Sequence, residues 1–306
     1  MAPGGYAWWY VDAVSDDARF GLVLIAFVGS VFSPYYARAR RQAPLHRADP
    51  LQHNALNLSL YTPAGKRWSM TERGGGALQR TAQCLQIGPS TLSWQQDHLT
   101  LRFDEVCAPW PTRLRGCVRL YPEHLQTRSW ALDRAGRHRW WPIATHARVE
   151  VDCREPSLRW RGQAYLDSNR GEESLEHAFS GWHWARAHRR RGEAVVFYDA
   201  MAVDGAATAL ALRARRDGTI EPFAPPPTAA LPRSAWGLAR ATRADGGAPC
   251  AVHRTLEDGP FYVRSLVDAR CLGESTRLMH ETLSLQRFRS RWVQALLPFR
   301  MPRRGD

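Results

Sequence analysis

Lysine is almost absent from this chain of 306 residues. Lys66 is the single lysine among 42 basic residues, so arginine carries nearly all of the positive charge. A formal net charge of +13 suits a nucleic acid or an anionic membrane surface. The chain has no recognisable nucleic-acid-binding motif, however, and its aromatic residues are spread along the whole sequence, which disfavours a nucleic-acid-binding protein.

Arginine clusters are the part of this charge that could act locally. They lie at residues 38–41, 186–191 and 300–304. Solvated loops and a basic tail would account for them, and so would contacts with phosphates. Because an arginine bias this strong also follows from genome composition, charge alone does not identify a partner.

Several patterns that mark common functional sites are missing. The six cysteines form no CxxC pair, and no His or Cys has zinc-finger spacing, so we expect reduced thiols and no metal centre. The sequence also lacks a Gly-x-Ser-x-Gly elbow, a P-loop and a dinucleotide fingerprint. These absences disfavour nucleophilic catalysis by serine and give no sign of a bound nucleotide.

Long hydrophobic runs are missing as well. The apolar run at residues 21–32 is too short to span a bilayer, which needs about 20 apolar residues. The first residues lack a basic region, and Asp12, Asp16 and Asp17 precede the apolar run, so we do not expect a secretory signal. These features predict an intracellular protein that is soluble or peripheral to a membrane.

Helical periodicity is scarce, and alternation of apolar and polar residues is frequent. Residues 54–60, 99–103 and 147–151 alternate with period two, which is typical of half-buried strands. Residues 21–32 are apolar on both faces, which favours a strand covered on both sides. Helices are expected only at residues 174–179 and around residues 281–297.

Turn signals support an all-β fold. Asp-Gly pairs at 204–205, 217–218, 245–246 and 258–259 separate apolar runs, and such pairs favour hairpins. Antiparallel sheets closed into barrels or sandwiches follow. The length suits two domains, and we place the boundary near residue 178, which gives domains at residues 1–178 and 179–306.

Two short pieces on expected strands carry the residues best suited to chemistry. Because residues i and i+2 point to the same face of a strand, His138 shares a face with Trp140, and Tyr165 shares a face with Asp167. On a sheet that encloses a cavity, the face of Tyr165 and Asp167 could be the interior.

Each of these residues taken singly has an ordinary explanation. A Tyr-x-Asp piece is commonly a strand end with an Asp that caps a turn, and Asp167 precedes the turn-like residues 168–171. His138 lies between Arg137 and Arg139, as a surface histidine often does. Periodicity does not show whether the two strands are neighbours.

Several blocks along nearly the whole chain resemble, in the right order, the carotenoid 1,2-hydratases, also called hydroxyneurosporene synthases. Such a series is more specific than any single motif. The blocks are residues 3–12 (PGGYAWWYVD), 27–36 (FVGSVFSPYY), 70–74 (MTERG), 136–140 (GRHRW), 165–171 (YLDSNRG) and 297–303 (LPFRMPR).

The resemblance implies two lipocalin-like antiparallel β-barrel domains in tandem and the addition of water to the end group of acyclic carotenoids. It implies no metal and no organic cofactor. It also implies that His138, Trp140, Tyr165 and Asp167 are the catalytic residues. These are the two pairs that strand geometry aligns without reference to the family.

The implied chemistry needs an acid that protonates an isolated alkene. Protonation at C2 leaves a cation on the tertiary carbon C1, and water captured there gives a tertiary alcohol. Asp167 suits the first step if desolvation, which raises a carboxyl pKa from about 3.9 by up to about 3–5 units, keeps it protonated. Trp140 and Tyr165 either stabilise the cation with their π faces or simply pack. His138 either accepts the proton of the attacking water or hydrogen-bonds Asp167.

Other carboxylates are weaker candidates for the acid. Asp104, Glu105 and Asp258 lie at expected turns, where solvated side chains are usual. Glu72 and Glu281 are second-rank candidates.

The expected partners are water and an acyclic carotenoid such as neurosporene or lycopene. A non-catalytic carrier of carotenoids or lipids is the main alternative, because lipocalin-like barrels hold apolar ligands without doing chemistry. Since a polyene is insoluble in water, we expect the arginine clusters to dock the protein on an anionic membrane, on the cytoplasmic face of the photosynthetic membrane.

Overall fold

The computed structural model describes residues 1–304 of the chain, apart from the side chains of His46 and Arg191. The side chain of Arg191, which belongs to the arginine cluster at 186–191, therefore lies outside the described residues. None of the helices in the described part of the chain combines the length and the apolar character needed to cross a membrane.

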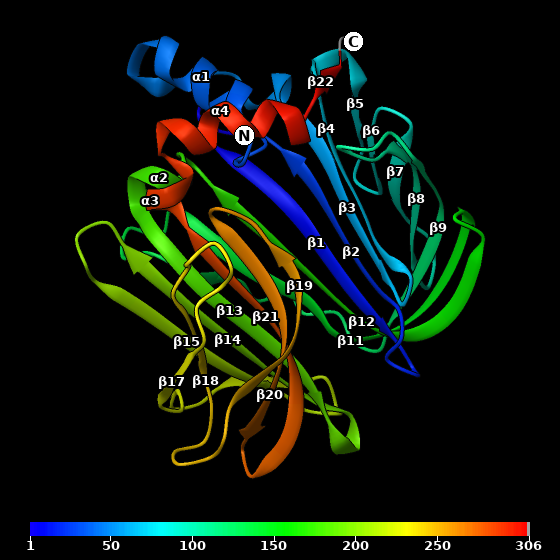
Figure 1. Ribbon diagram of the computed structural model, residues 1–306, viewed down its shortest axis with the longest axis vertical. Coiled ribbons are helices and arrows are strands. Elements are labelled where there is room, and N and C mark those ends of the chain that lie inside the picture. The colour runs from blue at the N-terminus through cyan, green and yellow to red at the C-terminus, as the bar shows by residue number, and fades with distance from the viewer. Residues whose placement is uncertain (305–306) are drawn as a thin grey trace. The chain divides into compact units, whose positions relative to one another are not determined.

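The chain consists almost entirely of antiparallel strands and divides into two compact units (Figure 1). Unit 1 comprises Met1–Ala131, Gly136–Ser174 and Gln294–Asp306, and unit 2 comprises Leu132–Ala135 and Leu175–Val293. This confirms the predicted all-β fold. The domain boundary near residue 178 stays a prediction.

Unit 1 contains a 13-stranded sheet in the order β22-β4-β3-β2-β1-β12-β11-β9-β8-β7-β6-β5, with β10 paired to β11. The helix α1 follows β2. The elements are β1 (Tyr6–Ser15), β2 (Gly21–Val28), α1 (Pro34–Gln42), β3 (Asn54–Thr62), β4 (Gly65–Arg73), β5 (Leu78–Arg80), β6 (Cys84–Ile87), β7 (Ser90–Trp94), β8 (Leu99–Val106), β9 (Arg113–Pro122), β10 (Trp130–Ala131), β11 (His138–Glu155), β12 (Leu158–Gly171) and β22 (Arg303–Arg304).

The sheet of unit 1 curls until β4 meets the segment that follows β8. The backbone N–H of Ala108 donates to the carbonyl oxygen of Trp68 at 3.0 Å, and the Arg67 side chain donates to the carbonyl oxygen of Arg113 at 2.9 Å. The curled sheet surrounds an apolar core of alternate strand residues, among them Leu24, Leu58, Leu101, Val118, Val149 and Leu166. The alternation of apolar residues that predicted these strands therefore places the apolar side chains in the core.

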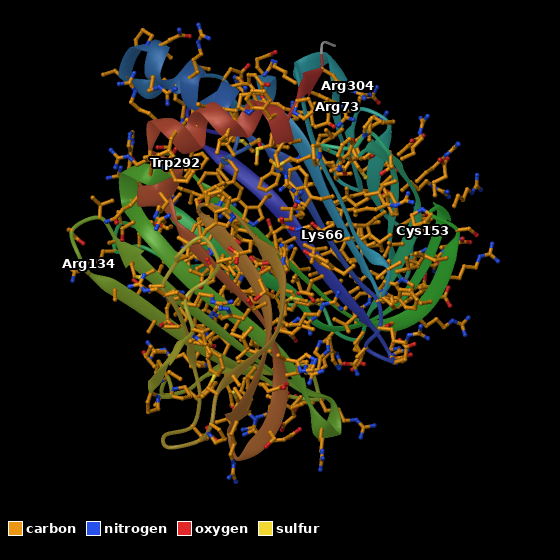
Figure 2. The ribbon with its side chains drawn as sticks, in the orientation of Figure 1. Lys66, Arg73, Arg134, Cys153, Trp292 and Arg304 are labelled. Atoms are coloured by element: carbon orange, nitrogen blue, oxygen red, sulfur yellow. The ribbon has the colours of Figure 1, made fainter. Side chains whose placement is uncertain are left out.

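The C-terminal end of the chain adds a short parallel strand to the edge of this sheet. In β22, Arg303 lies opposite Glu72 and Arg304 lies opposite Arg73, the pair labelled in Figure 2. The Arg303 guanidinium forms an ion pair with Glu72 and lies 3.1 Å from Nδ1 of His53. Arginines that the sequence placed in a basic tail therefore include one that is tied to the sheet.

Unit 2 contains a seven-stranded antiparallel sheet in the order β16-β15-β14-β13-β21-β20-β19 and a separate hairpin of β17 and β18. Its core includes Val195, Phe197, Val267 and Leu278. The elements are α2 (Leu175–Ala178), β13 (Phe179–Arg189), β14 (Glu193–Ala202), β15 (Ala207–Ala214), β16 (Ile220–Pro222), β17 (Thr228–Leu231), β18 (Arg240–Arg243), β19 (Ala251–Asp258), β20 (Tyr262–Cys271), β21 (Glu274–Ser284) and α3 (Leu285–Phe288); α4 (Arg291–Arg300) begins in unit 2 and ends in unit 1.

The turn and helix predictions hold with exceptions. Three of the four Asp-Gly pairs, at 204–205, 217–218 and 258–259, join strands that pair with each other. The pair at 245–246 joins β18 to β19, which do not pair, so the hairpin prediction is wrong there. The helix expected around 281–297 is divided into α3 and α4 and begins only at Leu285, because residues 281–284 complete β21. The expectation of no other helix is wrong, because α1 (Pro34–Gln42) begins after Ser33, whose side chain caps it.

Candidate active site

The candidate side chains lie on one face of the unit 1 sheet, across the neighbouring strands β1, β12 and β11. Along residues 6–12 of β1, alternate side chains share this face, since successive side chains of a strand point to opposite sides. β12 runs antiparallel to β1, with Tyr10 opposite Asp167 and Asp12 opposite Tyr165. β11 pairs with the other side of β12. Three strands thus bring their functional groups to one surface.

This face is opposite to the one that packs into the core of unit 1. Val11 on β1 and Leu166 on β12 alternate with the candidate residues, and both belong to the apolar core. Tyr165 and Asp167 therefore do not point into the interior that the curled sheet surrounds. Strand parity predicts which residues share a face, but it does not predict which face a sheet will enclose.

Asp167 accepts two hydrogen bonds at the same carboxyl oxygen. The indole Nε1–H of Trp140 donates to Oδ2 at 2.8 Å, and the hydroxyl of Tyr165 donates to Oδ2 at 3.0 Å. Trp140 and Tyr165 are fully buried, and Asp167 is 4% exposed. β12 continues to Gly171, so Asp167 lies within a strand, and the interpretation of Asp167 as a turn cap is wrong.

An irregularity in β11 lies beside this cluster. Trp140 is opposite Asn169 of β12, and the pairing register then shifts between Trp141 and Ala144 as β11 passes Asp167. Pro142 lies within the shift, and it has no N–H to give to the strand ladder. Bulges of this kind re-aim side chains and are frequent next to active sites. Here the indole reaches diagonally along the sheet to the carboxyl group two residues away from its direct partner.

His138 is also buried on this face, contrary to the surface position that its neighbours suggest. A hydrogen bond of 2.9 Å joins its Nδ1 to the hydroxyl of Tyr6, and its Nε2 lies 3.7 Å from a carboxylate oxygen of Glu173. The rings of Tyr6 and His138 stack with centroids 5.8 Å apart. The ring therefore has an orienting hydroxyl on one nitrogen and an acidic neighbour near the other.

Gly171 makes the approach of Tyr6 to His138 possible. It lies opposite Tyr6 on one side and opposite His138 on the other. A Cβ at this position would lie 2.3 Å from the Tyr6 ring and 2.6 Å from Nδ1 of His138, which is closer than any side chain tolerates. The glycine thus leaves the space through which the two rings meet.

The structure places all four predicted residues on one face and joins three of them through the carboxyl group of Asp167. The contacts described for His138 are with two residues that sequence reasoning missed, Tyr6 and Glu173. Tyr6 belongs to the alternating series Tyr6, Trp8, Tyr10 and Asp12, whose period of two was the available signal. Asp12 is fully buried, so this face carries a second carboxyl group.

Most of the rival carboxylates have cationic partners. Glu72 and Glu281 form ion pairs with Arg303 and Arg264. Asp104 and Glu105 lie in β8, so the expectation of a turn is wrong for both, and Glu105 is fully buried rather than solvated. Burial raises the pKa of Glu105, against the opposing effect of its partner Arg73 at 2.8 Å. The carboxyl groups of Glu72, Glu105 and Glu281 are therefore engaged in ion pairs with arginines.

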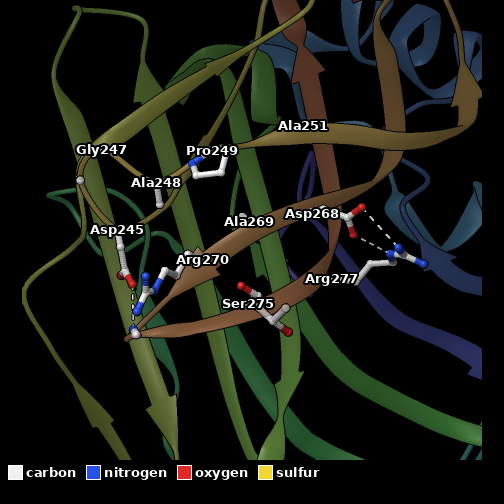
Figure 3. Close-up of a pocket in the computed structure, with 13 residues that line it drawn as sticks. Asp245, Gly247, Ala248, Pro249, Ala251, Asp268, Ala269, Arg270, Ser275 and Arg277 are labelled. Atoms are coloured by element: carbon white, nitrogen blue, oxygen red, sulfur yellow. Dashed lines mark hydrogen bonds and ion pairs between the residues drawn. The ribbon is translucent and has the colours of Figure 1, made fainter.

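A wide hollow of about 900 Å³ lies in unit 2 and has a different character (Figure 3). Arg277 donates to Asp268 at 2.8 Å, and Asp245 accepts from the backbone N–H groups of Leu272 and Gly273 at 2.9 and 2.7 Å. The charged side chains that line this hollow are thus engaged in contacts that hold turns and strands together. Within residues 1–304, no group of three or more His, Cys, Asp or Glu side chains could hold a metal ion.

Comparison with known proteins identifies close relatives of the chain. A family model described as carotenoid hydratase CrtC matches residues 24–306. The acyclic carotenoid 1,2-hydratase of Thiocapsa roseopersicina is 52% identical over 306 residues, which cover 100% of this chain and 75% of that protein. The acyclic carotenoid 1,2-hydratase of Rubrivivax gelatinosus is 48% identical over 305 residues, again with 100% and 75% covered.

The solved structure of CghA with Sch210972 resembles this chain in fold. The TM-score is 0.59 at 13% sequence identity, and the match covers 93% of this chain and 89% of that chain. At this identity the likeness concerns the fold alone. It confirms the predicted lipocalin-like architecture.

Proposed function

Since the chain belongs to the carotenoid hydratase CrtC family, we propose that it adds water to the terminal C1,C2 double bond of acyclic carotenoids and that Asp167 is the acid. Neurosporene, lycopene and their derivatives are the proposed substrates, and tertiary 1-hydroxy carotenoids are the products. The observation that carries this proposal is the buried Asp167 carboxyl, which accepts hydrogen bonds from Trp140 and Tyr165 at one oxygen.

The two donors on Oδ2 support a position for the acidic proton. In the protonated carboxyl group of the proposal, the oxygen that accepts two hydrogen bonds is the carbonyl oxygen, and the proton resides on Oδ1. In this arrangement Trp140 and Tyr165 fix the plane of the acid and direct its proton toward the alkene.

The proposed reaction begins with protonation of the alkene. The Asp167 proton moves to C2, the double bond supplies the electron pair of the new C–H bond, and the positive charge forms on C1. Aromatic faces stabilise such a cation by about 2 kcal/mol or more when they are desolvated. Trp140 and Tyr165 are buried beside the acid, and Tyr10 packs edge-on against Tyr165 at 6.3 Å.

Water then completes the addition. Its oxygen bonds to C1, and His138 accepts the proton that the water loses. Tyr6 and Glu173 hold the imidazole ring in place. Return of a proton to Asp167 regenerates the acid, so the cycle consumes only water and needs no cofactor.

Substitution of Asp167 by Asn tests the acid directly. The amide keeps the shape of the side chain but has no acidic proton, so we expect hydration to fall by about a hundredfold or more. Asp152→Asn is the matched control, because Asp152 lies on β11 in an exposed pair with Arg159. A carrier would bind carotenoid equally well in both variants. Appreciable turnover by Asp167→Asn would show that another group is the acid.

The reaction class has its own test. The purified protein is incubated with lycopene or neurosporene in isotopically labelled water, without added cofactor. Label in a tertiary hydroxyl group of the product supports the proposal. An unlabelled hydroxyl, or a requirement for an added cofactor, contradicts it.

The proposal includes contact with an anionic membrane on the cytoplasmic side, because the substrate is insoluble in water. Each arginine near an anionic surface contributes about 1 kcal/mol to binding. Arg38 and Arg41 of the 38–41 cluster are exposed, which leaves them accessible to lipid head groups.

A further inference from the structure

Unit 1 contains a second site of interest, an apolar cavity of about 460 Å³. Leu85, Leu92, Leu99, Ile143 and Leu166 form part of its wall. Because Leu166 lies between Tyr165 and Asp167 on β12, its side chain points to the opposite side of the sheet. The cavity and the proposed acid therefore lie on opposite faces of the same strand.

The cavity changes in character from its depth to its mouth. These four leucines and Ile143 are buried, whereas Trp9 and Trp94 are half-buried, and Trp141 and a fifth leucine of the lining, Leu125, are exposed. The hydrophilic rim is formed by Arg80 at the end of β5 and by loop residues at 81–83 and 126–127. A volume of this size falls in the range of about 300–1,000 Å³ that small-molecule pockets occupy.

The mouth of the cavity is held in place by hydrogen bonds. The backbone N–H of Gln126 donates to the carbonyl oxygen of Ile143 at 2.8 Å, and the indole N–H of Trp141 donates to the carbonyl oxygen of Gln126 at 2.6 Å. On the other side, the backbone N–H of Trp94 donates to Gln83 at 2.8 Å. The opening is thus preformed, which lowers the cost of binding.

Charge at the mouth has one sign. Arg80 is exposed, and its guanidinium lies 5.5 Å from the centroid of the Trp9 ring. Among the described residues that line the cavity, Arg80 is the charged one, and none is Asp or Glu. An apolar interior with a cation at its rim matches a hydrocarbon chain that ends in an anion.

We propose that this cavity binds the hydrocarbon chain of an anionic amphiphile, with the chain among the leucines and the anionic group beside Arg80. A free long-chain fatty acid and one acyl chain of an anionic phospholipid share this chemistry. A hydrocarbon chain bound in this cavity is separated from Asp167 by β12. The cavity is therefore distinct from the proposed catalytic site, and the binding proposal does not depend on the proposed hydration reaction.

Titration with cis-parinaric acid, a fluorescent fatty acid, tests the proposal. We expect saturable binding with one site per chain, accompanied by energy transfer from the tryptophans at the mouth. Asp167→Asn should bind the probe as the unchanged protein does, because its side chain faces away from the cavity. Absence of saturable binding below the concentration at which the probe forms micelles would overturn the proposal.

Reversing the charge of Arg80 tests whether the anionic group of the ligand lies beside this residue. Arg80→Glu should weaken probe binding by about fivefold or more, since an attraction becomes a repulsion at an exposed site. Arg102→Glu on β8 is the matched control, because Arg102 is exposed and does not line the cavity. The alcohol of equal chain length should bind both variants alike. Equal weakening by the two substitutions, or none by Arg80→Glu, would refute the assignment.

A larger side chain inside the cavity tests whether the hydrocarbon chain of the ligand binds there. Leu92→Phe should weaken binding of both the acid and the alcohol, because the larger side chain occupies space among the leucines. Unchanged binding by a folded Leu92→Phe protein contradicts the site, and if that variant does not fold, the Arg80 comparison decides. Displacement of the probe by phosphatidylglycerol vesicles indicates a membrane lipid as the source of the chain, and retention indicates a free fatty acid.

Discussion

At the scale of single residues, Trp140 has two separate roles in the proposed mechanism, and substitution can divide them. Its indole N–H donates to Asp167, and its ring is proposed to stabilise the cation. Phenylalanine keeps an aromatic face and loses the donor, whereas alanine loses both. The difference between the two variants therefore measures the contribution of the ring.

We expect Trp140→Phe to retain more hydration activity than Trp140→Ala. If the ring stabilises the cation by about 2 kcal/mol, the two rates differ by about thirtyfold. Initial rates with one carotenoid, measured on protein whose folding is verified by circular dichroism, give this ratio. Trp160→Phe and Trp160→Ala are the controls, since Trp160 lies on β12 but packs into the core on the other face. Equal losses in the two Trp140 variants would assign the ring to packing.

Sequence predicted which candidate residues share a strand face better than it predicted their neighbours. Alternation paired His138 with Trp140 and Tyr165 with Asp167, because parity within a strand is a local property. The contact of His138 with Tyr6 joins residues 132 positions apart. That contact depends on β1 and β11 lying on either side of β12, and local periodicity contains no information on strand order.

At the scale of elements, the buried histidine of β21 predicts a pH dependence of stability. Nε2 of His280 donates to the carbonyl oxygen of Ala241 at 2.8 Å, and the ring is fully buried. Burial lowers the pKa of His280 to about 3. The unfolded chain takes up this proton below about pH 6.5, whereas the folded chain does not until about pH 3. The stabilising contribution is therefore complete above pH 6.5 and is lost as the pH falls toward 3.

We expect His280→Gln to flatten this dependence. Between pH 6.5 and 5, the free energy of unfolding should fall by up to about 1.4 kcal/mol per pH unit from this residue in the unchanged protein, and that share should vanish in the variant. Urea unfolding followed by tryptophan fluorescence at several pH values measures the slopes. His98→Gln serves as the control, since His98 lies beside Asp97 at the surface. Identical slopes in His280→Gln and the unchanged protein would refute the prediction. His183, whose pKa burial also lowers, remains in all these variants.

Strands were predictable from the sequence where a single local pattern was enough to define them. Alternation alone predicted the strands β3 and β8, but the half-buried character expected of residues 54–60 is wrong, because β3 is buried on both faces. The turn at Asp245-Gly246 did not form a hairpin, because β18 pairs with β17 in a separate ribbon. A turn pair indicates that the chain reverses, but the partner of the next strand depends on contacts from elsewhere in the sequence.

At the scale of the whole molecule, a net charge of +13 does not mean that every arginine can meet a membrane. Arg40 is 5% exposed and lies 4.3 Å from the Tyr36 ring, and Arg186 is equally buried. Arg303 is held by Glu72. The clusters seen in the sequence therefore contain structural arginines as well as accessible ones, and the accessible ones should carry any electrostatic docking.

Reversal of the charge of two accessible arginines tests this distinction. We expect the protein to co-sediment with vesicles that contain phosphatidylglycerol at low salt and to be released at high salt, because salt screens surface charges. Arg38→Glu with Arg41→Glu should reduce this binding, since both arginines are exposed on α1. Arg119→Glu with Arg154→Glu changes the net charge equally, at exposed positions on β9 and β11, and should reduce it less. Binding that persists unchanged in high salt would exclude docking by arginines, and equal losses in the two double variants would show that net charge, rather than the α1 cluster, attracts the protein to the membrane.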